Sequence, residues 1–153
     1  MRVYRIVVKK YSKELSGFGA AVYGARWNSA GIEMVYTSEH RSLALCEILV
    51  HIKGMKRTDD YRMLCIDIPD KYPIGTLDKK DYPKEWTQRS SLNYTQDIGD
   101  AFIRQEDTIA LKVPSVIIPQ EYNVLLNPYH PKFKYVKLSE VEILTIDKRL
   151  ADK

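Results

Sequence analysis

The apolar residues of this chain fall in many short segments rather than in a few long ones, and this distribution limits the folds open to it. Segments that are rich in Val, Ile and Tyr and end at Pro, Gly, Asn or Asp are typical of β-strands. Proline closes several of them, in IDIP, KVP and LLNP, and it suits a strand end because it has no N–H group for the ladder. Strands are therefore expected at 2–8, 34–38, 63–69, 108–114, 123–127 and 141–147.

Two segments have the pattern of helices, and the clearer one lies at 41–53. Ser38 or Ser42 is its candidate N-cap, and Lys53 followed by Gly54 gives a basic last turn and a stop. A helical wheel at about 100° per residue places apolar side chains on nearly every face, which is typical of a buried helix.

The second helix is expected at 96–105, with Thr95 as its N-cap and Ile98, Ala101, Phe102 and Gln105 on its inward side. The stretch 70–91 mixes prolines with charges and is expected to be irregular. With 153 residues, 44% of them hydrophobic, the chain is expected to form one domain over 1–153. Its expected class is α+β, with a compact and mostly antiparallel or mixed sheet.

The charge balance is mildly basic, since 24 Lys and Arg against 20 Asp and Glu give a net charge of +4, and 11 Tyr accompany it. This composition raises the alternative of an RNA-binding or RNA-cleaving protein, because rings stack on bases and cations neutralise phosphates. The basic residues form no strong stripe along the sequence, however, and direct contact with nucleic acid is not expected.

Membrane and metal sites have no signal in the sequence. No apolar run approaches the roughly 20 residues that cross a bilayer, and the start lacks the apolar stretch and cleavage site of a signal peptide. A cytoplasmic protein with no membrane contact is expected. Cys46 and Cys65 lie in apolar runs and are expected to be buried thiols. Without a C-x-x-C motif or a paired Cys/His cluster, no metal is expected.

Arg26 lies in a glycine-rich stretch, 17–38, whose beginning has too little bulk for a core element. An arginine among glycine turns, beside the large ring of Trp27, indicates a guanidinium held for an anion such as phosphate. The alternative is a surface arginine that pairs with a neighbouring carboxylate.

Glu47 lies within the apolar helix at 41–53. A carboxylate there is costly unless a cation or hydrogen-bond donors meet it. It is therefore either half of a structural ion pair or a carboxylate whose burial and partners serve chemistry. The strand at 34–38 leads into this helix and is expected to bring Tyr36 and Ser38 near Glu47.

Six blocks in order strengthen the functional interpretation: GARWN, VYTSE, LALCEILVH, TQDIGD, LKVPS and NVLLNPYHP. Together they resemble the RES domain, a family named for an Arg, a Glu and a Ser that map onto Arg26, Glu47 and Ser115. The resemblance runs over about 4–136, and one departure is Ala25, where a common family form has glycine. It implies a fold similar to that of ADP-ribosyltransferase toxins.

The resemblance also implies a function. The chain is expected to be the toxin of a bacterial Xre–RES type II toxin–antitoxin pair, neutralised by an Xre-type helix-turn-helix antitoxin. Its expected activity is cleavage of the nicotinamide–ribose bond of NAD, by hydrolysis or by phosphorolysis with inorganic phosphate. Protein ADP-ribosylation with NAD and a non-catalytic interaction module are the alternatives. A homodimer is compatible with the sequence but not specified by it.

The family motif assigns residues to the NAD site. Arg26, Tyr36 and Glu47 are expected to be catalytic, and Arg26, Tyr36, Ser115 and Asn127 are expected to bind NAD, without a metal. The assignment is chemically reasonable because breaking the bond to nicotinamide builds positive charge on the ribose, which a fixed carboxylate stabilises.

Overall fold

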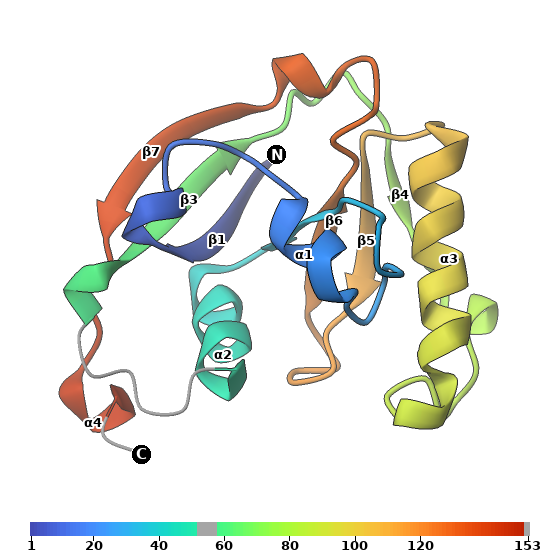
Figure 1. The fold of residues 1–153 in the computed structure, drawn as a ribbon, viewed down its shortest axis with the longest axis horizontal. Coiled ribbons are helices and arrows are strands. Elements are labelled where there is room, and N and C mark those ends of the chain that lie inside the picture. Colours follow the sequence, from blue (N-terminus) through green and yellow to red (C-terminus); the bar gives the residue numbers. More distant parts are fainter. Residues whose placement is uncertain (52–57, 152–153) are drawn as a thin grey trace.

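The computed structural model describes residues 1–51 and 58–151, and its centre is a seven-stranded mixed sheet (Figure 1). The strand order is β4-β5-β6-β2-β1-β3-β7, and all neighbours are antiparallel except the parallel pair β4 and β5. The strands are β1 (Arg2–Val8), β2 (Val35–Ser38), β3 (Tyr61–Asp67), β4 (Ile74–Thr76), β5 (Ala110–Pro114), β6 (Tyr122–Leu126) and β7 (Lys137–Ile143). The expected α+β class with a mixed sheet is confirmed.

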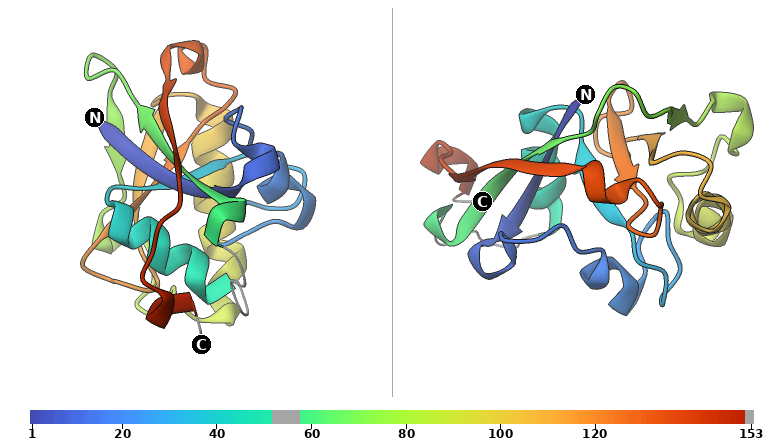
Figure 2. Two further views of the ribbon diagram at one scale, coloured as in Figure 1. Left: turned by 90° about the vertical axis from the view of Figure 1, so that its left-hand side faces the viewer. Right: turned by 90° about the horizontal axis from the view of Figure 1, so that it is seen from above.

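Helices pack around this sheet (Figure 1). They are α1 (Phe18–Tyr23), α2 (Arg41–His51), α3 (Leu92–Gln105) and α4 (Lys148–Ala151), and short 3₁₀ turns lie at Lys9–Tyr11, Thr58–Asp60, Lys79–Asp81, Arg89–Ser91 and Phe133–Tyr135. Helix α2 packs on β1 and β3, whereas α3 lies beside β4 and β5 (Figures 1 and 2). No helix in the described part of the chain is long and apolar enough to cross a membrane.

The sequence missed the helices α1 and α4 and the strand β4, and it misplaced the strand β7. Helix α1 falls in the glycine-rich stretch, and β4 falls in the stretch expected to be irregular. Strand β7 was expected at 141–147 but runs over Lys137–Ile143. The physical reason is that β7 is an edge strand with mostly exposed side chains, so its backbone pairing with β3 fixes it and an apolar pattern does not.

Helix α2 is less buried than its composition suggested. Among the side chains of Arg41 to Val50, for which burial is described, only Leu43 and Ala44 are buried, and Val50 is 60% exposed. The Lys53–Gly54 stop lies outside the described residues. Neither serine is the N-cap of this helix. Ser42 lies inside the helix, and the Ser38 hydroxyl donates to Asn123 Oδ1 at 2.7 Å.

Helix α3 begins four residues earlier than expected. Thr95 is therefore not an N-cap but lies fully buried within the helix, where its hydroxyl donates to the Leu92 carbonyl at 2.9 Å. Phe102 is buried as expected, against Val113 and other core residues. Gln105, expected on the inward side, is exposed.

The sheet opens between β1 and β2. These strands share the register pair Tyr4–Ser38, whereas β1 and β3 pair from Arg2–Asp67 to Val8–Tyr61. Tyr4–Ser38 is the register pair that joins the two halves of the sheet in the described chain. One buried apolar cluster spans both halves, and a further cluster in each half packs against a helix. Residues of both strands line a space large enough for a small ligand beside this pair.

Candidate functional site

A cavity of about 440 Å³ lies where β1 and β2 diverge. Both strands, helix α2, the loop after α1 and the β5–β6 connection contribute to its walls. It is lined by Tyr4, Arg5, Ile6, Gly24, Ala25, Arg26, Trp27, Tyr36, Thr37, Ser38, Ala44, Glu47, Ile48, Pro114, Val116 and Asn123. Its volume lies in the range of small-molecule sites.

Glu47 is fixed in this cavity through one of its two carboxylate oxygens. Oε1 accepts hydrogen bonds from Ser115 Oγ at 2.8 Å and from Asn123 Nδ2 at 2.5 Å. Among the described residues, no cation lies within ion-pair distance of Glu47, so the structural ion pair is not the interpretation that the structure favours. Neutral donors meet the carboxylate, and Oε2 has no hydrogen-bond partner within the described part.

Ser115 donates to Glu47 because its other hydrogen-bonding capacity is used. The side chain is fully buried, and its oxygen accepts from the backbone N–H groups of Ile117 at 3.0 Å and Ile118 at 3.1 Å. The hydroxyl proton is then directed to Glu47 Oε1. The residue that directly follows β5 thus acts on the carboxylate of α2, 68 positions earlier.

Asn123 is a site residue that the sequence analysis missed. Its Oδ1 accepts from Ser38 Oγ at 2.7 Å, which fixes the amide so that Nδ2 points to Glu47. Ser38 and Asn123 are register partners on β2 and β6. The signal in the sequence was a single Asn at the start of the block NVLLNP, and only the pairing of β2 with β6 brings it to the helix.

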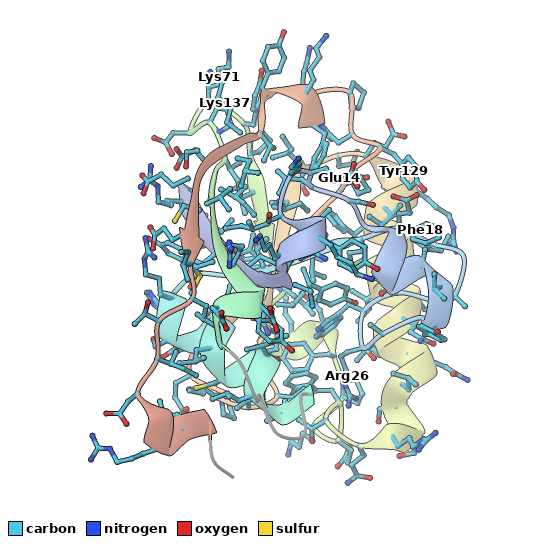
Figure 3. All side chains as sticks on the ribbon, turned by 60° about the vertical axis from the view of Figure 1, so that its left-hand side comes forward. Glu14, Phe18, Arg26, Lys71, Tyr129 and Lys137 are labelled. Carbon is cyan, nitrogen blue, oxygen red and sulfur yellow. The ribbon has the colours of Figure 1, made fainter. Side chains whose placement is uncertain are left out.

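Arg26 is not the ion-paired surface arginine of the alternative interpretation. Its Nη1 donates to the backbone carbonyls of Trp86 at 2.8 Å and Gln88 at 3.2 Å, in the loop before α3. Figure 3 labels the Arg26 side chain, which lies between α2 and α3 in that view. No carboxylate forms a salt bridge with it among the residues that the structure describes. The guanidinium is held at the cavity by neutral acceptors.

The loop that carries Arg26 is rigidly anchored. Trp27 is 2% exposed and its ring lies 5.6 Å from that of Trp86. Gly24 ends α1 with φ of +70°, a conformation that favours glycine. A Cβ at Gly99 of α3 would collide with the Trp27 carbonyl, so the helix packs directly against this loop. The segment expected to lack core elements therefore contributes a buried anchor.

Tyr36 holds the same loop through its hydroxyl. The oxygen accepts from Trp27 N at 3.0 Å and donates to Asn28 Oδ1 at 2.8 Å. Burial raises the pKa of Tyr36 well above its ordinary value, so the hydroxyl stays neutral at physiological pH. Tyr36 lines the cavity, while its hydroxyl forms hydrogen bonds with the Arg26 loop.

Strand β1 adds a second guanidinium. Arg5 Nη1 donates to the Ser16 carbonyl at 3.0 Å, and burial lowers the pKa of Arg5 from its ordinary value. Within the described chain it has no carboxylate partner. The sequence did not single out Arg5, and its place on β1 beside Tyr4 is what brings it to the cavity.

The structure does not bring Asn127 to this cavity. Asn127 is fully buried at the end of β6, where Nδ2 donates to the Ile103 carbonyl and Oδ1 accepts from Tyr129 N, both at 2.9 Å. Its side chain ties β6 to α3 and the following loop. The other expected residues are brought together: Arg26, Tyr36 and Glu47 line the cavity, and Ser115 contacts Glu47.

One cluster outside the cavity has the residue types of a metal site. Cys65, Glu140 and Glu142 present ligand atoms within 4.8 Å of one another on β3 and β7. Both oxygens of Glu142 are hydrogen-bonded to the Arg41 guanidinium, at 2.6 Å and 2.8 Å, so a cation would have to displace an arginine. Cys65 is buried as expected, whereas Cys46 is only partly buried.

Comparison with known proteins identifies the family of the chain. Residues 2–147 match the family model of the RES domain. The chain is 37% identical over 146 residues to a protein of Yersinia enterocolitica named Toxin Res, covering 95% of each chain. It is 32% identical over 142 residues to a protein of a Sphingobium species named Prs ADP-ribosylating toxin, covering 92% of this chain and 88% of the relative.

A solved structure shares the fold. A chain from the crystal structure of the M. tuberculosis MbcT–MbcA toxin–antitoxin complex matches with a TM-score of 0.75, covering 94% of this chain and 84% of that one. At 18% identity, this likeness concerns the fold alone, and it is consistent with the expected ADP-ribosyltransferase-like architecture. The family match spans nearly the whole sequence, and two separate curated relatives extend over the same length. The chain belongs to the RES domain family.

Proposed function

We propose that this protein is a toxin enzyme that consumes NAD by breaking the bond between nicotinamide and ribose. One observation carries the proposal: the Glu47 carboxylate, fixed by Ser115 and Asn123, lines the same cavity as the guanidiniums of Arg26 and Arg5. Neither arginine has a carboxylate partner in the described residues. Two such cations suit the diphosphate of a substrate, and a carboxylate suits a sugar that becomes positively charged during the reaction.

Glu47 has the properties that this chemistry needs. As the bond to nicotinamide breaks, positive charge develops on the ribose, and a carboxylate already fixed in a partly dry site stabilises that charge without reorganisation. Nicotinamide leaves as a neutral molecule, so the reaction needs no strong general acid. Glu47 Oε2, which is free of described partners, is the oxygen assigned to the sugar or to the incoming nucleophile.

The remaining residues bind and position. We assign the diphosphate to Arg26 and Arg5, because a guanidinium presents a planar fork to phosphate oxygens. The Tyr36 ring forms a cavity wall, and its neutral hydroxyl holds the Arg26 loop. Ser115 acts on Glu47 rather than on the substrate, because its hydroxyl is fully used. Asn127 is left out of the site, since its side chain is occupied elsewhere.

Transfer of ADP-ribose to a protein is the second candidate function. The Sphingobium relative, 32% identical to this chain, carries the name of an ADP-ribosylating toxin. The chemistry is shared up to departure of nicotinamide, and the acceptor decides the outcome: water, inorganic phosphate or a protein side chain. We also infer an antitoxin partner, of the Xre type in this family, because relatives are named as toxins and the solved neighbour is titled a toxin–antitoxin complex.

The test is incubation of the purified chain with NAD, with and without inorganic phosphate, followed by chromatography of the products. Release of nicotinamide is expected in the wild type and a loss of about 100-fold or more in Glu47→Gln, which keeps the shape but removes the charge. Glu140→Gln is the matched control, because Glu140 is an exposed carboxylate on β7 that pairs with Arg2. ADP-ribose indicates hydrolysis, and a phosphorylated product indicates phosphorolysis.

Two results would contradict the proposal. One is the absence of nicotinamide release by a folded wild-type protein freed of any antitoxin. The other is a Glu47→Gln protein that turns over NAD at the wild-type rate. Labelled NAD added to a cell extract distinguishes the second candidate function, because protein ADP-ribosylation leaves the label on protein.

A further inference from the structure

Arg41, the first residue of α2, connects this helix to the edge of the sheet. Its Nη1 and Nη2 donate to Glu142 Oε2 at 2.6 Å and Oε1 at 2.8 Å, so the guanidinium and the carboxylate meet in a two-pronged pair. Nη2 also lies 3.2 Å from the sulfur of buried Cys65. Three contacts from β3 and β7 therefore fix the position of one side chain at the start of α2.

The guanidinium also covers the ring of Tyr4. Its central carbon lies 4.8 Å from the ring centroid, within the range of a cation–π contact. Tyr4 lines the cavity, whereas Arg41 is not among the described lining residues. Arg41 therefore contacts the ring of a residue of the cavity wall without itself belonging to that wall.

The location of Arg41 breaks a local rule of helix design. A cation in the first turn of a helix opposes the helix dipole and is unfavourable by itself. Glu142 offsets that cost, and it does so with a side chain that comes from the last strand of the sheet. Departures of this kind concentrate where a protein needs a geometry more than local stability.

We propose that Arg41, held by Glu142, is a positioning residue that fixes the Tyr4 ring as a platform on which a planar ring of the substrate stacks. The inference rests on the proposed function, because it requires a substrate with such a ring, and NAD contains two. Tyr4 would contact the substrate, and Arg41 would act only through Tyr4. A ring held in place before binding gives more affinity than one that must be ordered on binding.

The experiment compares kcat and KM for nicotinamide release from NAD in variants of this cluster. Arg41→Met removes the cation and the pair with Glu142, and Glu142→Gln loosens the pair while it keeps Arg41. Both are expected to raise KM about tenfold, in line with the usual worth of an aromatic stack, with kcat within about twofold of the wild type. Tyr4→Leu is expected to raise KM at least as much, and Tyr4→Phe is expected to retain most of the wild-type affinity.

The matched control is Arg2→Met. Arg2 also pairs with acidic residues of β3 and β7, donating to Asp67 at 2.8 Å and to Glu140 at 3.0 Å, but it has no aromatic ring contact in the described chain. Its loss should lower the melting temperature without a change in the KM for NAD. Arg41→Lys keeps the positive charge but loses the two-pronged guanidinium that meets Glu142. Its KM for NAD is expected to lie between those of the wild type and Arg41→Met.

The outcomes separate this inference from the proposed function. Wild-type turnover with an unchanged KM in folded Arg41→Met and Tyr4→Leu overturns the inference alone. A fall in kcat with an unchanged KM also overturns it, because Arg41 would then act through the helix that carries Glu47. Absence of both NAD turnover and NAD binding in the wild type overturns the proposed function and this inference with it.

Discussion

Ser115 and Glu47 form the central contact of the site, a hydrogen bond of 2.8 Å between a strand end and a helix 68 residues apart in the sequence. Two backbone N–H groups occupy the serine oxygen, so the hydroxyl proton has one direction left. Asn123 approaches the same carboxylate oxygen, at 2.5 Å. Both donors fix the orientation of a side chain that would otherwise be free to rotate.

The two donors are expected to act as a unit. Ser115→Ala and Asn123→Ala should each lower kcat for NAD about tenfold, because Glu47 loses one of the two hydrogen bonds that orient it. The double variant should lose less than the product of the two single effects, since both act through one oxygen. Steady-state kinetics on the three proteins measures this, and independent, multiplicative effects would contradict a shared role.

Arg26 is expected to bind the diphosphate part of the substrate. Arg26→Gln should weaken NAD and ADP-ribose binding in parallel, by about tenfold or more, because both ligands contain the diphosphate. Calorimetric titration of each ligand measures the two affinities. If NAD binding weakens while ADP-ribose binding does not, then Arg26 contacts the nicotinamide part instead.

Tyr36 is expected to act through structure and not as an acid or base. Tyr36→Phe removes the acceptor of Trp27 N and the donor to Asn28, which should cost about 1–3 kcal/mol of folding free energy near neutral pH. The pKa of this hydroxyl is raised in the folded state, so its contribution is full below the ordinary value of 10.0 and is lost as the pH rises beyond it.

The difference in stability between wild type and Tyr36→Phe should therefore shrink above pH 10, where the wild type alone must keep a buried phenol neutral. Urea unfolding at several pH values tests this. The pH profile of NAD turnover should have the same shape in both proteins, and loss of one limb of the profile in the variant would reveal a proton-transfer role.

Asn127→Ala is expected to affect stability and not catalysis. The variant loses hydrogen bonds to Ile103 and Tyr129 at a fully buried position, which should cost about 2–3 kcal/mol. Thermal unfolding measures the loss, and kcat at a temperature where the variant is folded should equal that of the wild type. A folded variant with kcat reduced 100-fold would contradict this expectation and show that Asn127 contributes to catalysis.

Gly99→Ala is expected to disturb the Arg26 loop. The added methyl group would collide with the carbonyl of Trp27, so either α3 or the loop must move, and both folding stability and NAD affinity should fall. Gly19→Ala is the control, because nothing lies within 4 Å of the added atom and alanine favours the helix there. Equal effects of the two substitutions would show that the contact with Trp27 is unimportant.

The sequence by itself predicts the parts of this fold in which burial and local pattern agree. Strand β1 lies where its Val and Ile pattern placed it, and α2 begins at the expected Arg41. By contrast, β4 is three residues long, and β7 is an exposed edge strand. Backbone hydrogen bonds to neighbouring strands hold both β4 and β7 in place. Such pairing requires few particular side chains, so the sequence pattern does not reveal it.

The same division holds for the site. A carboxylate in an apolar helix and an arginine among glycines were visible in the sequence, because each departs from its surroundings. Their partners were not visible, because Asn123, Arg5 and the Trp86 carbonyl belong to segments with no local anomaly.

The sequence by itself determined that Arg26, Tyr36 and Glu47 are candidate site residues, since their residue types and family blocks are local properties. The tertiary structure alone decided that Ser115 serves Glu47, that Asn127 lies elsewhere, and that Tyr4 and Arg5 reach the same cavity. The physical reason is the divergence of β1 and β2 beyond their Tyr4–Ser38 pair, which depends on how distant strands pair and not on any one segment.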